Sequence, residues 1–266
     1  MTRFSPARIA TMLLRYVYLL TASWPRTLDL IYWPMVQMIL WGFTSRFLMS
    51  NSSYVARAGG VLLGAVLLWD VLVRSQLGVS VSFLEELWSR NLGQLFISPL
   101  RPYEWVISLI AMSVVRVLIG VVPAVLLAIP LYHYSLFSLG LPLIAFFTLL
   151  IGMGWGIGLA LGALLLRHGL GAESLAWAAV FILAPASAVY YPVAILPHWL
   201  QYVAWALPSA HMFEGMRTVM FEQRFAWDHF AAAGALDLVD LALGAAAFLY
   251  AFGLARRRGS LMAQGE

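Results

Sequence analysis

Residues 139–166, LGLPLIAFFTLLIGMGWGIGLALGALLL, contain no charged side chain, and they exceed the roughly 20 apolar residues that cross a bilayer. Hydrophobic residues form 62% of the 266-residue chain and charged residues 11%, against about 25% charged residues in a globular domain. This small number of charged residues cannot cover a surface that faces water. Most of the surface is therefore expected to face lipid. The composition therefore predicts an integral membrane protein and excludes a disordered chain and a nucleic-acid-binding protein.

Five further apolar stretches accompany this one, and together they predict a single all-α domain, residues 1–266, with six transmembrane helices. The intervals between charges place the spans at about residues 29–49, 58–82, 104–131, 139–166, 174–196 and 231–255. Residues 174–213 carry no charge, and as one helix they would be about twice as long as the membrane core is thick. We therefore expect the chain to turn at its prolines after the fifth span and to form a re-entrant outer segment up to about residue 221.

The distribution of arginine predicts the orientation, because all 16 basic residues are arginines. With six spans, ten arginines fall on the side of both termini and four on the other side. The ten are Arg3, Arg8, Arg15, Arg26, Arg90, Arg101, Arg167, Arg256, Arg257 and Arg258, and the four are Arg46, Arg57, Arg217 and Arg224. Since positively charged loops stay in the cytoplasm, both termini are predicted to be cytoplasmic.

An amphipathic helix is predicted over about residues 5–22, before the first span. Its apolar residues recur at helical spacing, and its basic residues Arg8 and Arg15 lie together on another face. The apolar residues are Ile9, Met12, Leu13, Tyr16, Val17 and Leu20. Such a helix lies in the headgroup plane, so we expect its arginines to face lipid phosphates.

Three charges fall within the predicted spans. Asp70 and Arg74 are four residues apart, so they share a helix face and can pair, which lowers the cost of burying each charge. Such a pair is either a contact that fixes helix packing, which we favour, or part of a proton relay or gate. Arg116 is alone in its span and is expected to pair with Asp70 or Asp29 or to reach a lipid headgroup.

Glycines recur every four residues in the fourth span, at Gly154, Gly158 and Gly162. This spacing forms a ridge of small residues that lets helices approach closely, either within the chain or at an interface between subunits.

No set of residues predicts catalysis, a bound cofactor or a metal ion in this chain. It contains no cysteine and no lysine, which excludes thiol nucleophiles, cysteine-ligated zinc and the lysine-containing P-loop for ATP. The histidines lack metal-ligand spacing, and the pair Asp237 and Asp240 is expected to be solvated. The chain is therefore predicted not to be an enzyme, and an ATPase that drives it would be another protein.

The longest cytoplasmic connection, FLEELWSRNLGQLFISPLRPYEW at residues 83–105, predicts an amphipathic helix that its prolines end. The apolar stripe consists of Leu84, Leu87, Trp88, Leu92, Leu95 and Phe96. A cytoplasmic amphipathic helix between two spans is suited to docking a soluble partner, and the alternative is a helix that lies on lipid.

Two segments resemble ABC-2-type transporter permeases. FLEE at residues 83–86 and LFISPLRP at 95–102 are similar to the family's L-E-E/R and S-P-L-[RK]-P signature. LPHWLQ at residues 196–201, then Pro208 and EGMR at 214–217, resemble the family pattern before the last span.

This resemblance implies the permease subunit of an ABC exporter in a bacterial inner membrane. Two permeases, a homodimer being favoured, would form the substrate path and pair with two ATPase subunits that bind ATP and Mg²⁺. The resemblance assigns ATPase coupling to Glu85, Glu86, Trp88, Arg90, Leu95, Phe96, Ser98, Pro99 and Arg101. It assigns the re-entrant segment to Pro197, Trp199, Pro208, Glu214 and Arg217. Charge reversal at Glu85, Glu86 or Arg90 is expected to uncouple transport in a folded permease.

Two other functions are compatible with the residues alone. A secondary transporter would use Asp70 and Arg74 for proton coupling, and an intramembrane enzyme would need a catalytic set that the chain does not present. The substrate stays open between a glycan, a lipid, a drug and an ion.

Overall fold

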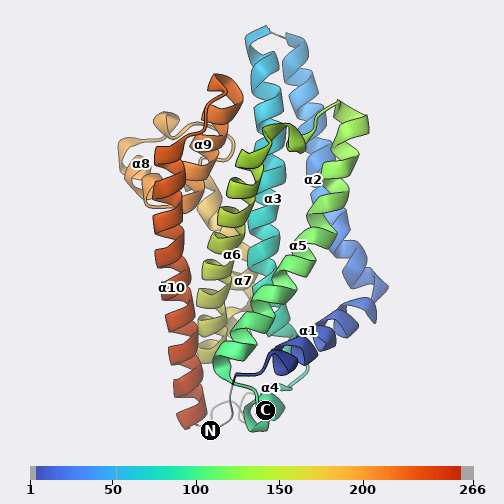
Figure 1. Ribbon diagram of the computed structural model, residues 1–266, viewed down its shortest axis with the longest axis vertical. Coiled ribbons are helices and arrows are strands. Elements are labelled where there is room, and N and C mark those ends of the chain that lie inside the picture. The colour runs from blue at the N-terminus through green and yellow to red at the C-terminus, as the bar shows by residue number, and fades with distance from the viewer. Residues whose placement is uncertain (1–3, 52, 259–266) are drawn as a thin grey trace.

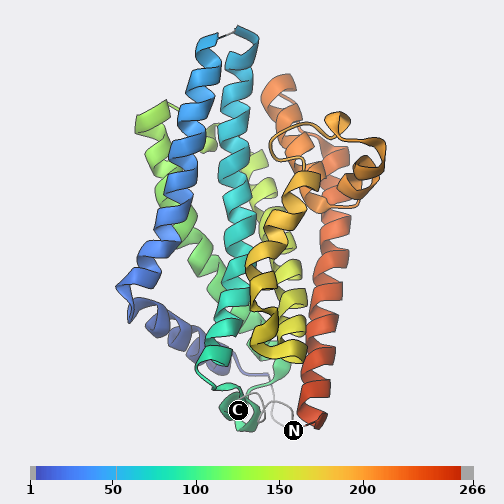
Figure 2. The same cartoon turned by 180° about the vertical axis from the view of Figure 1, so that it is seen from behind.

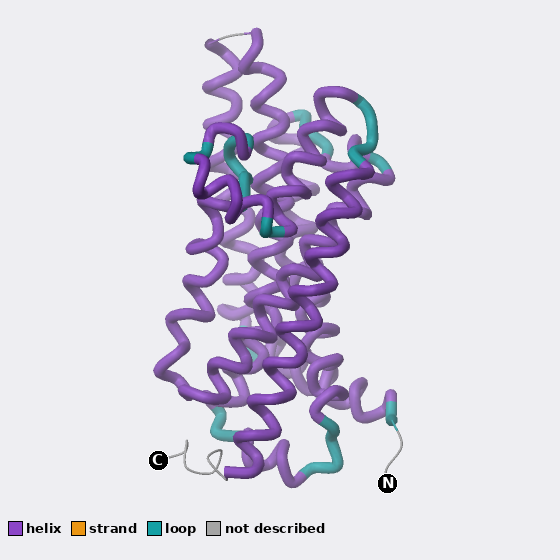
Figure 3. The backbone as a smooth tube through the Cα atoms, turned by 90° about the vertical axis from the view of Figure 1, so that its left-hand side faces the viewer, coloured by secondary structure: helices purple, strands orange, loops and turns teal. Residues whose placement is uncertain are grey.

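The computed structural model describes residues 4–51 and 53–258, and the side chains of residues 48–51, 53–60, 96 and 258 lie outside the described part. The described residues form helices and loops and contain no strand, so the all-α prediction is confirmed. Long helices run side by side along the molecule, and loops lie mainly towards its two ends (Figures 1 and 3).

The long helices are α2 (Trp24–Asn51), α3 (Ser53–Trp88), α5 (Pro102–Tyr132), α6 (Leu141–His168) and α10 (Trp227–Arg258). The shorter ones are α1 (Pro6–Thr21), α4 (Leu92–Ile97), η1 (Leu136–Leu139), η2 (Gly169–Ala172), α7 (Glu173–Leu183), η3 (Ala184–Ala186), η4 (Val193–Ile195), α8 (His198–Trp205) and α9 (Pro208–Glu222). We call the end of the bundle with α1, α4 and the last turns of α10 the α1 end, and the opposite end, with α8 and α9, the α9 end (Figure 1).

Helix α6, which contains most of the uncharged stretch, lies between α3 and α10 and packs closely against both. A Cβ atom at Gly154 would lie 2.6 Å from Cβ of Ser75, and one at Gly158 would lie 2.7 Å from Cβ of Val79. At Gly162 the nearest atoms, 3.0 Å away, belong to the Phe248 ring of α10. The glycine ridge therefore faces helices of its own chain, so these positions are not available to a second subunit.

Four helical stretches of the described residues are long and apolar enough to cross a membrane: Val61–Trp88, Pro102–Tyr132, Leu141–Ala186 and Trp227–Arg257. The third is a hairpin, because Gly169 has φ +62° and turns the chain so that α7 runs beside α6 (Figure 2). Helix α2, which carries the predicted first span, does not meet this criterion but runs alongside α3 (Figure 2).

The predicted end of the fifth span is wrong. The span was expected to reach residue 196, but helical structure stops at Ala186 and an irregular loop follows. Pro185 lies in η3, Ala188 has φ +55°, and Pro192 is extended at ψ 150°. Proline removes a backbone donor and a positive φ breaks the helical path, so the chain leaves the helix about ten residues early.

Candidate functional site

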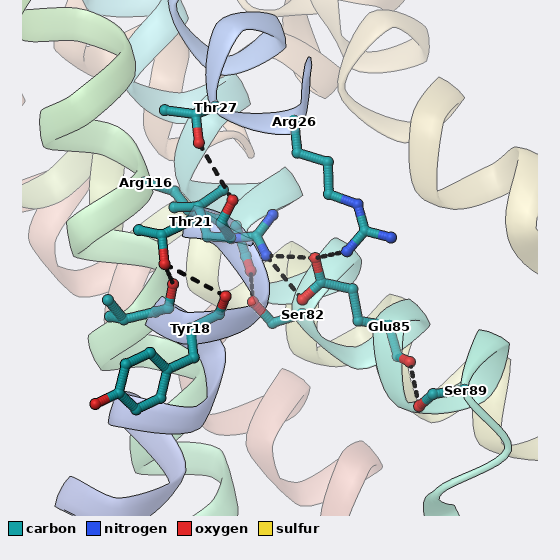
Figure 4. Close-up of polar contacts among 11 residues, drawn as sticks. Tyr18, Thr21, Arg26, Thr27, Ser82, Glu85, Ser89 and Arg116 are labelled. Atoms are coloured by element: carbon teal, nitrogen blue, oxygen red, sulfur yellow. Dashed lines mark hydrogen bonds and ion pairs between the residues drawn. The ribbon is translucent and has the colours of Figure 1, made fainter. Parts of the chain in front are cut away.

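Three buried glutamates organise the α1 end of the bundle, and we call them the glutamate cluster: Glu85, Glu86 and Glu104. Glu85, in the last turns of α3, accepts two hydrogen bonds of 2.9 Å from Nη2 of Arg116 on α5. Arg26 of α2 approaches the same carboxylate at 3.8 Å, so that two guanidinium groups converge on it (Figure 4). Arg116 and Glu85 are each 5% exposed in their side chains, which makes this a buried ion pair between α3 and α5.

The other two glutamates fasten α1. Glu86 accepts hydrogen bonds from Arg15 and, at 2.9 Å, from Nδ2 of Asn91. Glu104 accepts a 2.7 Å hydrogen bond from Arg8 and 3.0 Å bonds from the backbone N–H groups of Ser5 and Arg101. The amphipathic helix is present, but the expected direction of its arginines is wrong, since Arg8 and Arg15 bind protein carboxylates. A buried carboxylate is a stronger partner for them than a headgroup in water, because little water screens the pair.

Aromatic side chains support the same end from inside the bundle. Trp105 is fully buried and donates from Nε1 to the Tyr16 hydroxyl at 2.9 Å. Its ring stacks on Phe83 and forms a T-shaped pair with Phe248. Burial and the neighbouring Glu86 carboxylate raise the pKa of the Tyr16 phenol well above its usual range. These rings join α1, α3, α5 and α10 into one packed unit.

The predicted coupling helix is not one continuous helix. Helix α3 continues to Trp88, the chain turns at Arg90 with φ +52°, and α4 begins only at Leu92. The apolar stripe is mainly buried inside the chain, at Leu84, Leu87, Leu92 and Leu95, whereas Trp88 is 42% exposed. The buried members of the stripe belong to the same apolar core as Met12, Trp105 and Phe248, so neither lipid nor a partner covers them.

The residues assigned to coupling differ in exposure. Glu85, Glu86 and Leu95 are buried, and Ser98 and Arg101 are half-buried. Trp88, Arg90 and Pro99 are exposed, and so are Gln94 and Ile97, of which Ile97 is 74% exposed. The side chain of Phe96 lies outside the described residues. We call the exposed set Trp88, Arg90, Gln94, Ile97 and Pro99 the α4 surface.

A groove with buried charges runs along α2, α3 and α7, which lie side by side with α3 in the middle (Figure 2). Its α1-side cavity has about 440 Å³ and its α9-side cavity about 470 Å³. The two cavities share Asp29, Arg74, Leu77 and Trp177, so they adjoin each other along the groove. The groove passes from the glutamate cluster towards the α9 end.

The expected pairing of the intramembrane charges is wrong. Arg116 pairs with Glu85 and not with Asp70 or Asp29. Asp70 and Arg74 are 5% and 6% exposed, but no ion pair within 4 Å joins them in the described part of the chain. The two charges still interact electrostatically in the groove. The stem of Arg74 lies beside Gly120, where an added Cβ atom would be 3.5 Å from Arg74 Cδ.

At the α9 end, Glu214 and Arg217 of α9 hold the irregular loop after α7. Arg217 donates from Nη2 to the carbonyl groups of Ala188, Val189 and Tyr191, the last two at 3.1 Å. Glu214 accepts a 2.6 Å hydrogen bond from the Val193 N–H and lies 3.5 Å from Arg217. Burial lowers the pKa of the Arg217 guanidinium, and the Glu214 carboxylate opposes that shift. These bonds replace the helical bonds that the loop lacks.

The other residues assigned to the re-entrant segment are at helix starts or on the surface. Pro197 precedes α8 in an extended conformation, and Pro208 is the first residue of α9, where its missing N–H has no cost. Trp199 is 68% exposed.

Replacing Arg217 by glutamine is expected to open this loop, because glutamine cannot reach three carbonyl groups. Each buried acceptor left without a donor costs about 1–3 kcal/mol. Hydrogen–deuterium exchange of residues 187–196 should accelerate by about tenfold or more, while exchange in α6 stays unchanged. Arg224→Gln, at an exposed ion pair with Glu222, is the matched control. Equal exchange in both variants would show that Arg217 does not hold the loop.

The expectation that Asp237 is solvated is wrong, because its side chain is buried. It is 8% exposed and packs against Gly152 of α6, while Asp240 packs by its backbone against Gly156. Within residues 4–51 and 53–258, no three histidine, aspartate or glutamate residues lie close enough together to hold a metal ion.

The apolar helices and the groove of buried charges define an α-helical membrane protein. Over residues 46–255 the sequence matches the family described as ABC-2 family transporter protein, and the chain belongs to this family. The resemblance to ABC-2-type permeases is thereby confirmed. The chain is accordingly a membrane component of an ABC-type transporter, a class that works with an ATPase partner. A search of the curated proteins finds no match to this chain.

Proposed function

We propose that this chain is the permease subunit of an ATP-driven exporter and forms the substrate path across the membrane. The observation that carries the proposal is the exposed α4 surface at the α1 end, which the Asn91–Glu86 hydrogen bond joins to the buried glutamate cluster. A partner that binds α4 would push on α1, α3 and α5 together, because buried ion pairs join these helices. Family membership supports the same function.

The energy source in this proposal is a separate ATPase subunit that binds ATP and Mg²⁺. The chain has no lysine, and the P-loop that cradles ATP phosphates requires one. Two permeases, as a homodimer, would combine with two ATPase subunits. The exposed apolar residues of α2 and α7, among them Trp33 and Phe181, offer a surface on which a second copy could close the groove.

The proposed topology has six spans, with α2 as the first and α7 with η3 as the fifth. It puts the α1 end in the cytoplasm of a bacterial inner membrane and the α9 end outside. The arginine distribution supports this orientation, because Arg90, Arg101 and Arg167 belong to the α1 end and Arg217 and Arg224 to the α9 end.

Changing Ile97 to aspartate is expected to weaken ATPase binding without unfolding the permease. Ile97 is 74% exposed, so the change leaves the core intact, but an unpaired charge buried at an interface costs several kcal/mol. Copurification with the coexpressed ATPase subunit should fall by at least about tenfold. Arg90→Glu tests the charged edge of the same surface.

Ile195→Asp is the matched control, because Ile195 is 70% exposed at the α9 end. It should copurify with the ATPase as the unchanged chain does, and all three variants should unfold at the same temperature. ATPase binding that survives both Ile97→Asp and Arg90→Glu would remove the α4 surface from the proposal.

A further inference from the structure

We infer that the α9-side cavity of the groove binds a lipophilic organic cation. This inference rests on the proposed function, since the cation would be the class of substrate that the permease moves. The cavity, of about 470 Å³, is large enough for a small organic molecule and lies between α2, α3, α7 and the loop that follows α7.

Aromatic residues are five of the twelve residues that line the cavity. Trp33 comes from α2, Trp69 from α3, Trp177 and Phe181 from α7, and Tyr190 from the following loop. Trp33, Trp177 and Phe181 are 50%, 42% and 58% exposed, so their rings are accessible to a ligand. The face of an aromatic ring carries negative charge and attracts cations, most strongly for tryptophan.

The charges of the cavity also favour a cation. Its charged residues are Asp29, Asp70 and Arg74, two carboxylates against one guanidinium. Asp29 already accepts a 2.9 Å hydrogen bond from Trp33. Asp70 is only 5% exposed, and its buried Oδ2 atom has no hydrogen-bond partner among the residues that the structure describes. The Arg74 charge offsets only part of the cost of burying this carboxylate, and a bound cation would offset more of it.

The α1-side cavity has the opposite balance. Its charged residues are Arg26, Arg74, Arg116, Asp29 and Glu85, three guanidinium groups against two carboxylates. The potential along the groove therefore becomes more negative from the α1 end towards Asp70. A cation is favoured only in the α9-side cavity, and the apolar walls require that its body be lipophilic.

The test uses tetraphenylphosphonium and tetraphenylborate, which have the same shape and opposite charge. Binding to the full chain in lipid nanodiscs is measured by titration calorimetry, with binding to empty nanodiscs subtracted. We expect saturable binding of the cation and weaker binding of the borate. Asp70→Asn should weaken cation binding by about tenfold or more, because it removes the buried charge and retains the shape.

Two further variants test whether cation binding depends on the charges of the groove. Asp228→Asn, an exposed residue of α10 outside the groove, should leave cation binding unchanged. Arg74→Gln removes the opposing charge and should preserve or tighten it. Tighter binding of the borate, or cation binding that Asp70→Asn does not weaken, would overturn the inference. ATPase copurification is measured on the same preparations, and if it persists while cation binding is absent, only the substrate class fails.

Discussion

Replacing Glu85 by alanine is expected to lower the free energy of unfolding by about 3–5 kcal/mol, the largest effect of any single change in the glutamate cluster. The reason is that Arg116, 5% exposed in its side chain, would keep its charge inside the protein without its carboxylate partner. Arg26 would lose the same partner, so α2 and α5 would both lose their ion pair with the end of α3. Chemical unfolding of the full chain in detergent, followed by tryptophan fluorescence, measures the loss.

A double variant distinguishes the effect of losing the Glu85–Arg116 ion pair from the effect of losing side-chain packing. Glu85→Met with Arg116→Met replaces the buried ion pair by apolar side chains and should recover most of the stability. Glu222→Ala is the matched control, because Glu222 and Arg224 form an ion pair whose side chains are 53% and 68% exposed. Such an exposed pair contributes about 0–1 kcal/mol. If the double variant is as unstable as Glu85→Ala, the buried pair is not what stabilises this end.

This prediction corrects the view of Glu85 and Glu86 as residues that a partner protein touches. Their carboxylates are buried, so charge reversal there would disrupt the fold before it altered any docking. Arg90 is exposed, and charge reversal at this position stays a test of coupling in a folded permease.

Replacing Gly244 by leucine is expected to separate α6 from α10 and to destabilise the chain by about 3 kcal/mol. A Cβ atom at Gly244 would overlap the carbonyl oxygen of Gly156, a backbone atom that cannot rotate away. The two helices would have to move apart, and Asp237 would lose its packing against Gly152. The same unfolding measurement detects the change.

Gly253→Leu on the same helix is the control, because a Cβ atom there has no neighbour within 4 Å in the described part of the chain. It should be neutral or slightly stabilising, since leucine is a better helix former than glycine by about 0.5–1 kcal/mol. Equal stability of the two variants would mean that the close approach of α6 and α10 is not needed.

The long apolar helices could be predicted because their signal is local. Residues 139–166 hold no charge, and every backbone group of a helix is satisfied within the helix, so an uncharged run of this length indicates one. The turn after the fifth helix was also predictable from its prolines, but its position was not. Arg217 holds the carbonyl of Ala188 from 29 positions further along the chain, and no local pattern connects the two residues.

The partners of the charged residues could not be predicted from the sequence for a similar reason. The sequence pattern of one helix does not indicate which other helices cover Glu85 and Glu86. From the sequence these two residues therefore look like an exposed acidic pair. Their guanidinium partners, Arg116 and Arg15, lie 31 and 71 positions away. One signal was available for Glu104, the third residue of α5, which receives the Arg101 N–H in a capping box.

By itself, the sequence determined that this is an all-α membrane protein of the ABC-2 family with no lysine for a P-loop of its own, because composition, apolar length and motif are properties of neighbouring residues. Only the tertiary structure decided which charges are partners, which face of the cytoplasmic segment is exposed, and where a groove with an unpaired carboxylate lies. Those features depend on contacts between distant helices, and a buried charge takes whichever partner packing brings within reach.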